Sequence, residues 1–513
     1  MCGIAGVWGA ADGDLLDRLV ASIGHRGPDG RGRELRPLGA LGHCRLAIMD
    51  PLGGAQPIMN EHGTASIVAN GEIYNFPQLR DELAGRHRWR TSSDSESVLH
   101  LFAEHDLAAA TKLRGMFAWA IMTDDRLVLA RDPIGIKPLY LGSGPGAAGR
   151  PVLAFSSELT ELCNWADEVK EFPPGHVYDS RTGFARYYTV PSPAPERLPV
   201  AEQLALVRHA LEQSVASHMM SDVPVGAFLS GGLDSSVIAA IARRHVDELH
   251  TFSVGTAGSS DLRAARLVAE HIGSIHHEYV ITLDDVRREL PDIVSHLESF
   301  DQDLVRSAIP THFCARLASQ HVKVILTGEG ADELFAGYRF HHGFDDLDAL
   351  HQELCRSVGT LHDINLQRAD RLTMRHGVEG RVPFLDTDFI EMALRIPPDL
   401  KLPPAADRRT EKWVLRQACA DLLPAEIVWR VKEQFDEGSG IADLVAASVQ
   451  ELLADAATRT GFDPVAYRSG VREFLRSDEE TLYHHLLTHR LARPERLLAN
   501  VARWIDDRVP STT

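Results

Sequence analysis

The chain has 513 residues, of which 44% are hydrophobic and 24% are charged, and its formal net charge is −19. This length is too great for one hydrophobic core and predicts two large domains. The negative charge argues against nucleic acid or an anionic membrane surface as a general partner, because each would need a basic face.

The six cysteines are spread along the chain, at positions 2, 44, 163, 314, 355 and 419, with no Cys-x-x-Cys pair. This spacing predicts free thiols in a reducing compartment rather than a disulfide framework. The first residues lack the basic segment and apolar core of a signal peptide, and no run of about 18 uncharged apolar residues could span a bilayer. We therefore expect a cytoplasmic protein.

The chain opens on Met1-Cys2-Gly3-Ile4-Ala5-Gly6-Val7-Trp8, an alternation of small and apolar residues that predicts a strand. If Met1 is removed, Cys2 carries both a thiol nucleophile and a free α-amine that can act as its base, as in N-terminal nucleophile hydrolases. Taken alone, a cysteine at position 2 is more often a small buried hydrophobe.

Four further short motifs follow in order: HRGPD at 25–29, RLAIMD at 45–50, NGEIYN at 70–75 and SDSE at 93–96. Together with MCGIAG at 1–6, they resemble the glutaminase domain of class II glutamine amidotransferases. Short strands separated by Gly and Pro continue to about residue 190. They predict a layered, largely antiparallel β domain with helices on its faces, of the N-terminal nucleophile hydrolase type, over residues 1–190.

The resemblance implies that Cys2 hydrolyses glutamine and that Asn70 and the Gly71 amide form an oxyanion hole. It also implies that Arg45 holds the α-carboxylate of glutamine and Asp94 its α-amine, which suits a bidentate guanidinium and an acid. Taken alone, Asn70-Gly71 is more often a turn and Arg45 a surface ion-pair member. The residues implied in glutamine binding are Arg45, Asn70, Gly71, Glu72 and Asp94.

Four prolines within residues 190–199 predict a stiff, extended linker over residues 191–200. From residue 201 onward, strand-like runs alternate with helical stretches; the runs cover residues 223–229, 249–255, 277–281 and 322–326. This alternation predicts a doubly wound parallel α/β domain over residues 201–513. Ligands of such sheets bind at the carboxyl ends of the strands.

One loop at such a strand end is Ser230-Gly231-Gly232-Leu233-Asp234-Ser235-Ser236. Loop amides, a helix N-terminus and hydroxyls together make an anion site, and Asp234 indicates a cation such as Mg²⁺ in the same place. The loop matches the SGG-x-DSS signature of the ATP pyrophosphatase fold and is not a P-loop, because no lysine follows. The resemblance implies adenylyl transfer from ATP; the plain alternative is a helix cap.

A second strand-end loop, residues 327–335, carries Glu329, Asp332 and Glu333 within five residues. Three acids beside a phosphate-binding loop require a cation or a raised pKa, although acids are also common at helix N-termini. With GVEGRVPFLD at 377–386 and RVKEQF at 430–435, this loop completes a resemblance to glutamine-hydrolysing asparagine synthetases. The resemblance runs from Cys2 to about residue 440.

The asparagine synthetase resemblance implies that Asp234 and Asp332 bind Mg²⁺ together with the ATP phosphates. It implies that Glu329 handles the proton of incoming ammonia and that Lys432 neutralises charge at the adenylate. From sequence alone, a solvated surface lysine would be favoured at 432. The residues implied in ATP binding are Leu229, Ser230, Gly231, Gly232, Asp234, Ser235, Ser236, Val254, Thr327 and Gly328.

The expected reaction releases ammonia from glutamine at Cys2, passes it through a sheltered tunnel, and amidates a small carboxylic acid that ATP has activated as an acyl-adenylate. L-Aspartate is the default acceptor, and a homodimer is the expected assembly. The stretches LVRSAI at 304–309 and DEGSG at 436–440 depart from the family pattern and leave another carboxylic acid open as the acceptor.

The sequence disfavours two other functions. Intramolecular amide closure, as in β-lactam synthetases, is disfavoured because those relatives need no ammonia and lack the N-terminal cysteine. An alternative of another class is a glutaminase whose second domain only binds a regulatory nucleotide. Asp234, Glu329, Asp332 and Lys432 together disfavour it, because a binding module needs no proton-handling carboxylate.

Two more expectations concern structure alone. Residues 411–416 are predicted as helix, and the charged tail from about residue 441 is predicted as helical without chemistry of its own. In that tail, His484, His485 and His489 have helical spacing and no nearby acid or cysteine. This pattern favours a solvated helix face over a metal site.

Overall fold

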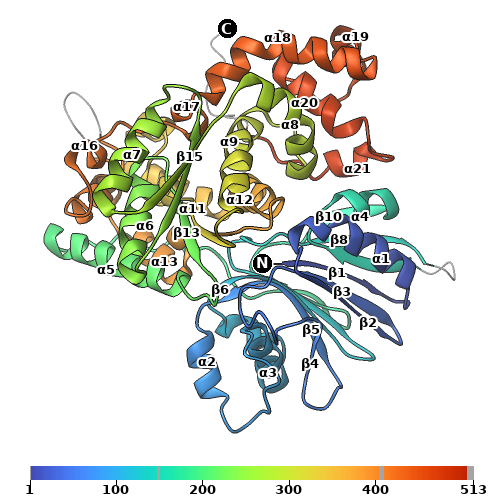
Figure 1. Ribbon diagram of the computed structural model, residues 1–513. Helices are drawn as coiled ribbons and strands as arrows, with labels where there is room; N and C mark the ends of the chain where they lie inside the picture. The colour runs from blue at the N-terminus through green and yellow to red at the C-terminus, as the bar shows by residue number, and fades with distance from the viewer. Residues whose placement is uncertain (1, 147–150, 404–409, 505–513) are drawn as a thin grey trace.

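The computed structural model describes residues 2–146, 151–403 and 410–504, and within this part the strands form three sheets (Figure 1). The first sheet has the order β10 (Glu168–Glu171), β8 (Tyr140–Pro145), β9 (Pro151–Ser156), β1 (Cys2–Trp8), β3 (Gly39–Arg45), β2 (Gly30–Arg36). The second has the order β12 (Gly183–Arg186), β11 (His176–Asp179), β7 (Leu127–Arg131), β6 (Gly115–Met122), β5 (Ser66–Ile73), β4 (Ile58–Met59).

Neighbouring strands are antiparallel in both of these sheets, as predicted. The two sheets pack face to face through Ile4 and Leu41 on one side and Val68, Ala118 and Leu129 on the other, all of them buried. Helices α1 (Gly13–Ser22) and α4 (Thr160–Trp165) cover the first sheet, and α2 (Phe76–Glu82) and α3 (Ser95–His105) cover the second. The result is a four-layer arrangement that brings the first residues of β1 close to β5.

The third sheet is parallel throughout, with the order β15 (Ile275–Val280), β14 (His250–Gly255), β13 (Val225–Phe228), β16 (Val324–Leu326), β17 (Glu379–Arg381). Helices α5 (Val200–His218), α6 (Leu233–Ala242) and α7 (Ser260–Ile272) pack on one face, and α8 (Leu283–Leu297) and α9 (Gln302–Ala318) on the other. This confirms the doubly wound prediction, because side chains alternate along buried strands toward both helical layers.

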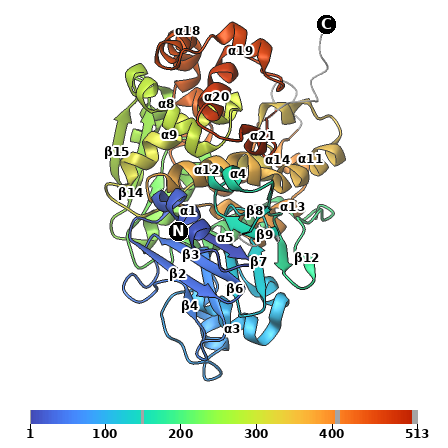
Figure 2. The ribbon, with the colours of Figure 1, turned by 90° about the vertical axis from the view of Figure 1, so that its right-hand side faces the viewer.

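The remaining helices surround this sheet and form the tail at the top of Figures 1 and 2. They are α10 (Ala331–Phe335), α11 (Leu347–Gly359), α12 (Asn365–Met374), α13 (Thr387–Arg395), α14 (Pro398–Lys401), α15 (Trp413–Ala418), α16 (Ala425–Val428), α17 (Phe435–Gly438), α18 (Ile441–Thr460), α19 (Pro464–Gly470), α20 (Asp478–Thr488) and α21 (Pro494–Leu498). No helix within the described ranges is long and apolar enough to cross a membrane.

A buried network of charges joins the antiparallel half to the parallel half. The fully buried Arg26 guanidinium lies 2.9 Å from Glu158 and 2.7 Å from Asp370 of α12, and its Nε donates to the Cys2 carbonyl at 3.2 Å. Beside it, Arg371 lies 2.7 Å from Glu298. Because an unpaired buried charge is strongly destabilising, this network fixes the relative position of the two halves.

Two predictions about the C-terminal part are wrong. His484 and His485 are buried rather than solvated, at 3% and 7% exposure, and His484 lies 3.4 Å from Glu473. Their side of α20 packs on the core because the tail covers α8 and α9. The helix predicted over residues 411–416 begins only at Trp413, and Lys412 before it has a φ of +56°.

Candidate functional site

The first group of predicted site residues lies at the start of β1. The backbone nitrogen of Cys2 donates to Asn70 Oδ1 at 3.0 Å, and the thiol lies 3.9 Å from the Leu46 carbonyl. Burial raises the pKa of the Cys2 thiol. A thiol with a raised pKa needs a base before it can attack a carbon atom.

Strand β5 supplies a polar group beside this thiol. The Asn70 side chain is fully buried, and its Nδ2 has no hydrogen-bond partner among the described residues. The next residue, Gly71, has a φ of +145°, and a Cβ there would lie 1.9 Å from the Met116 carbonyl oxygen. Only glycine suits this position. The strand therefore presents a free N–H donor where charge would develop on a substrate carbonyl.

Arg45 and Asp94 lie on two other elements, β3 and the N-terminus of α3. Arg45 is the residue opposite Cys2 in the β1–β3 pair. Asp94 is buried at the N-terminus of α3, where it accepts hydrogen bonds from the Ile73 and Ser95 amides at 2.7 and 2.9 Å. Burial raises the pKa of Asp94 to about 6.

The Arg45 guanidinium is held by backbone oxygens rather than by an acid. It donates to the carbonyls of Met49, Asp50 and Pro51 at 3.4, 2.6 and 3.0 Å. No carboxylate of the described residues pairs with this guanidinium, so the surface ion-pair interpretation is not supported. A guanidinium in this state is suited to an anionic ligand.

Glu72 is also buried, but it faces the parallel half. It lies 3.5 Å from Arg381 at the end of β17, and burial together with the charge of Glu379 raises the pKa of Glu72. This residue is close to the region between the two halves.

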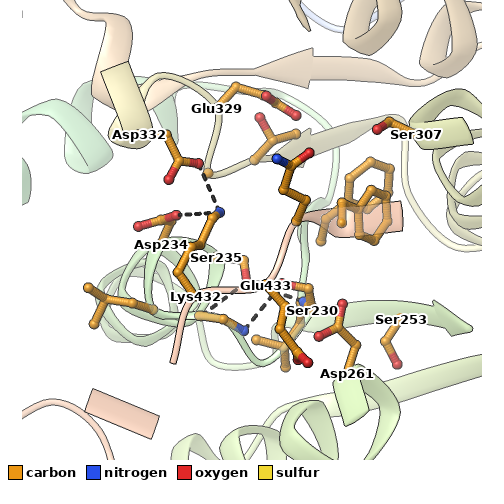
Figure 3. Close-up of a pocket in the computed structure, with 18 of the residues that line it drawn as sticks. Ser230, Asp234, Ser235, Ser253, Asp261, Ser307, Glu329, Asp332, Lys432 and Glu433 are labelled. Carbon is orange, nitrogen blue, oxygen red and sulfur yellow. Dashed lines mark hydrogen bonds and ion pairs between the residues drawn. The ribbon is translucent and has the colours of Figure 1, made fainter. Parts of the chain in front are cut away.

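A cavity lies at the carboxyl ends of the parallel strands. It is lined by the Ser230 loop and by residues of β14, α9, α10, α12 and the 430–435 segment (Figure 3). The Ser230 and Ser235 hydroxyls lie 3.0 Å apart, and the Gly232 amide donates to Ser230 Oγ at 3.3 Å. A hydroxyl-rich turn at a helix N-terminus is suited to phosphate oxygens.

Most of the residues predicted to bind ATP line this cavity. Those that do are Leu229, Ser230, Gly232, Asp234, Ser235, Val254, Thr327 and Gly328. Gly231 and Ser236 lie behind the lining. Gly231 has a φ of +73°, and a Cβ there would come within 2.5 Å of Ala264 in α7. Its part is therefore to let the loop turn close to α7.

Two carboxylates and two ammonium groups meet on one wall of the cavity. Lys412 Nζ lies 2.5 Å from Asp234 and 2.7 Å from Asp332, and Lys432 Nζ lies 2.9 Å from Asp332. Figure 3 shows Lys432 reaching between the two aspartates. Although burial alone would raise it, the two lysines hold the pKa of Asp332 below its ordinary value. Lys432 is not the solvated surface residue that sequence alone favoured.

The same wall fits a divalent cation. Asp234 Oδ1 is buried and has no hydrogen-bond partner in the described part of the chain. Carboxylate oxygens of this kind are the usual protein ligands of Mg²⁺, which is normally shared with substrate phosphates. Asp234 and Asp332 would hold the ion.

Glu329 projects into the cavity opposite Ser307 (Figure 3). It lies 2.5 Å from the guanidinium of Arg368, a buried residue of α12. This ion pair fixes the position of the carboxylate at the cavity wall.

The comparisons with known proteins match the two halves of the chain separately. A family model described as "Glutamine amidotransferase domain" matches residues 1–187, and one described as "Asparagine synthase" matches residues 206–345 and 342–506. "Asparagine synthetase [glutamine-hydrolyzing] 2" of Arabidopsis thaliana is 40% identical over 463 residues, which cover 86% of this chain and 79% of the relative. The chain belongs to the glutamine-hydrolysing asparagine synthetase family.

Further relatives carry the same description. "Probable asparagine synthetase [glutamine-hydrolyzing]" of Schizosaccharomyces pombe is 39% identical, and the match covers 86% of this chain and 85% of the relative. Among solved structures, a glutamine phosphoribosylpyrophosphate amidotransferase from B. subtilis, complexed with ADP and GMP, matches 49% of this chain and 65% of its own with 20% identity and a TM-score of 0.31.

In this member of the asparagine synthetase family, the structure adds residues that the sequence did not single out. Lys412 is 1% exposed and bonded to both aspartates, and Arg368 pairs with Glu329. Tyr338 and Asn365 also line the cavity, and both bond to the buried Glu333, at 2.5 and 3.3 Å. Burial and the charge of Asp332 raise the pKa of Glu333 to about 7.

The departing segment 304–309 lies on α9 at the edge of this cavity. Ser307 lines the cavity, whereas Arg306 donates to Glu479 of α20 at 2.8 and 2.5 Å. The tail, for which the sequence predicted no chemistry, therefore contacts α9 through this ion pair. In this asparagine synthetase family member, α9 is thus anchored by the C-terminal helices.

Proposed function

We propose that this protein is a glutamine-dependent amidotransferase that converts L-aspartate to L-asparagine through an acyl-adenylate, with ATP as the activating substrate and release of AMP and pyrophosphate. The observation that carries the proposal is that one chain holds both a buried Cys2 beside a free Asn70 donor and a strand-end cavity with Asp234 and Asp332. The names of the relatives support aspartate as the acceptor.

At the glutaminase site, removal of Met1 turns the Cys2 nitrogen into an α-amine that Asn70 Oδ1 already orients. This amine takes the thiol proton, and the thiolate attacks the glutamine carboxamide. The Asn70 Nδ2 and the Gly71 amide then donate to the tetrahedral oxyanion. Arg45 and Asp94 are the proposed partners of the α-carboxylate and α-amine.

At the synthetase site, the Ser230 loop would hold the pyrophosphate part of ATP, and Lys412 and Lys432 offset phosphate charge. When bound by Asp234 and Asp332, Mg²⁺ would neutralise further phosphate charge. The acceptor carboxylate displaces pyrophosphate to give the acyl-adenylate. Ammonia then attacks, Glu329 accepts its proton, and AMP leaves.

Free ammonia must be kept from water between these steps, because in neutral water it is mostly protonated and not nucleophilic. The ion pair of Arg26 with Asp370 brings the two halves into contact, and we propose that ammonia passes between them. We propose the division 1–190, 191–200 and 201–513, which the absence of helix or strand from 187 to 199 supports. The homodimer and the cytoplasmic setting stay predictions.

A second acceptor is favoured by one observation. Ser307 faces the cavity from a segment that departs from the family pattern, and another carboxylic acid would then replace aspartate with the machinery unchanged. The test is pyrophosphate release with ATP, Mg²⁺, glutamine and a panel of carboxylic acids, with aspartate first. If none of the carboxylic acids increases pyrophosphate release, the synthetase assignment is refuted and a glutaminase with a regulatory nucleotide domain is favoured.

Replacement of Asp234 or Asp332 by Asn is expected to suppress pyrophosphate release while glutamine hydrolysis continues. The reason is the loss of a carboxylate charge that would bind Mg²⁺ beside the ATP phosphates. The two activities are measured separately on each variant. Asp348→Asn, in the exposed first turn of α11, is the control for loss of an acid at a helix N-terminus. Pyrophosphate release at the wild-type rate in both test variants would show that the two aspartates are structural.

The KM for glutamine is expected to rise as the pH falls through about 6, because Asp94 then gains a proton and loses the charge that binds the substrate amine. Asp94→Asn should raise this KM about tenfold or more above pH 7, where the wild-type carboxylate is ionised, and should abolish the pH dependence, since a bond to a charged group contributes about 1.5–3 kcal/mol. Steady-state glutaminase kinetics from pH 5 to 8 measure both, with the exposed Asp81→Asn as the control. An unchanged profile in Asp94→Asn would contradict the role.

Glu479→Gln is expected to weaken the hold of α20 on Arg306, lower the free energy of unfolding by about 1–3 kcal/mol, and raise the acceptor KM several-fold. Glutaminase kcat/KM should not change, because Glu479 bonds only to α9 and Tyr483. Denaturant unfolding and acceptor-dependent pyrophosphate release test this. The matched tail variant is Glu495→Gln, which removes a 71% exposed acid. An acceptor KM that equals the control's would separate the tail from the acceptor site.

A further inference from the structure

Three histidines from separate elements meet on one face of the parallel sheet. His250 is the first residue of β14, and His277 lies in β15, where it pairs with Phe252. His321 lies in the turn between α9 and β16. The proposed ATP cavity opens at the carboxyl ends of the strands, whereas His250 begins its strand, so this cluster is separate from the chemistry proposed above.

The three imidazoles form a stack on Phe252. The His277 and His321 ring centroids lie 3.9 Å apart, and those of His250 and His277 lie 5.2 Å apart with planes inclined by 13°. His250 Nδ1 and His277 Nε2 are 2.9 Å apart. One nitrogen from each ring lies within 4.8 Å of the others.

The cluster is open to a cation from solvent, because His321 is exposed. Ligand nitrogens at about 2.0–2.1 Å from a tetrahedral ion lie about 3.3 Å apart, and the three ring nitrogens here lie within 4.8 Å of one another. Binding would therefore require the side chains to rotate until their nitrogens point at the ion.

We propose that His250, His277 and His321 bind a divalent transition-metal ion, with Zn²⁺ as the preferred ion and water as the fourth ligand. Three imidazoles are a ligand set suited to zinc and poorly suited to Mg²⁺, which prefers oxygen. The bound ion would pin β15, the edge strand of the sheet, to the turn that follows α9. Its effect is therefore on stability rather than on the amidation chemistry.

Two other groups of possible ligands in the described ranges are weaker candidates. In one, His87 lies 3.0 Å from Glu104, and in the other, His362 lies 2.8 Å from Glu171. Their imidazoles are thus already bonded to carboxylates that also pair with arginines. The His250 cluster has no acid among its ring contacts and no competing ion pair of this kind.

The test is zinc titration of the full-length, chelator-treated protein in competition with a chromophoric chelator. Wild type is expected to bind one Zn²⁺ that His321→Ala weakens at least about tenfold, because even outer-shell partners of a zinc site contribute that much. His250→Gln should weaken it similarly. His209→Ala, which removes a lone exposed histidine of α5, is the matched control and should bind as wild type does.

X-ray absorption of the zinc-loaded protein should show about three imidazole nitrogens at about 2.0–2.1 Å. Zinc should also raise the Tm of wild type and of His209→Ala more than that of His321→Ala. Equal zinc affinity in wild type and His321→Ala would overturn the proposal, as would an absorption spectrum dominated by oxygen ligands. Because His321 is exposed, loss of binding in its variant with an unchanged circular dichroism spectrum supports the site rather than misfolding.

Discussion

Cys2→Ala is expected to abolish glutamine-dependent amide formation and to leave ammonia-dependent formation near the wild-type rate. The nucleophile is lost at the start of β1, whereas Asp234, Asp332 and Glu329 line the cavity of the parallel half and are untouched. Loss of the attacking group of a covalent mechanism typically reduces the rate by several orders of magnitude, about 10⁴-fold or more. Product formation with glutamine and, separately, with ammonium salts measures the two rates.

The matched control is Cys44→Ala. Cys44 is a fully buried thiol of β3, next to Arg45 in the strand that pairs with β1, so the variant reports on packing without removing the nucleophile. It should retain glutamine-dependent synthesis. If Cys2→Ala loses both activities equally, the glutaminase and synthetase sites are not independent and the proposal of two separate sites is wrong.

Glu329→Gln is expected to separate activation of the acceptor from its amidation. The variant keeps the shape of the side chain but cannot accept a proton, so amide formation should fall by about 10²-fold or more. Adenylation needs no base at this position, and acceptor-dependent exchange of labelled pyrophosphate into ATP should therefore persist. Both rates are measured on the same preparation.

Glu426→Gln, which changes an exposed glutamate of α16, serves as the control and should leave both rates unchanged. Loss of exchange together with amide in Glu329→Gln would assign this carboxylate to adenylation or metal binding. Wild-type amide formation would reduce it to an acid at a helix N-terminus that pairs with Arg368.

The sequence predicted best those features that are local. The Ser230 loop is a contiguous strand, loop and helix, so its position at a strand end follows from the chain order. The antiparallel half was likewise readable from short strands and turns. Family resemblance then supplied Asn70, which bonds to the Cys2 nitrogen, and Asp332, which lines the cavity at the parallel strand ends.

Lys412 and Arg368 were missed because their significance depends on distant contacts. Lys412 lies 178 positions from its partner Asp234 along the chain, and nothing in the neighbouring residues marks it as buried. Its one anomaly, a positive φ before α15, is visible only in three dimensions. His484 and His485 were misassigned for the same reason, because helical spacing does not tell which face another helix will cover.

The Arg26 network described above also bears on how freely the two halves could be interchanged. Arg26 forms an ion pair with Asp370, and Glu158 lies 3.4 Å from Arg371. Each half therefore supplies counter-charges for the other inside a buried interface. A glutaminase half transplanted from a different amidotransferase would leave several of these groups unmatched, each at a cost of about 3–5 kcal/mol. The charges of the two halves are therefore matched to each other, and a chimera of this enzyme would have to exchange positions 26, 158, 370 and 371 together.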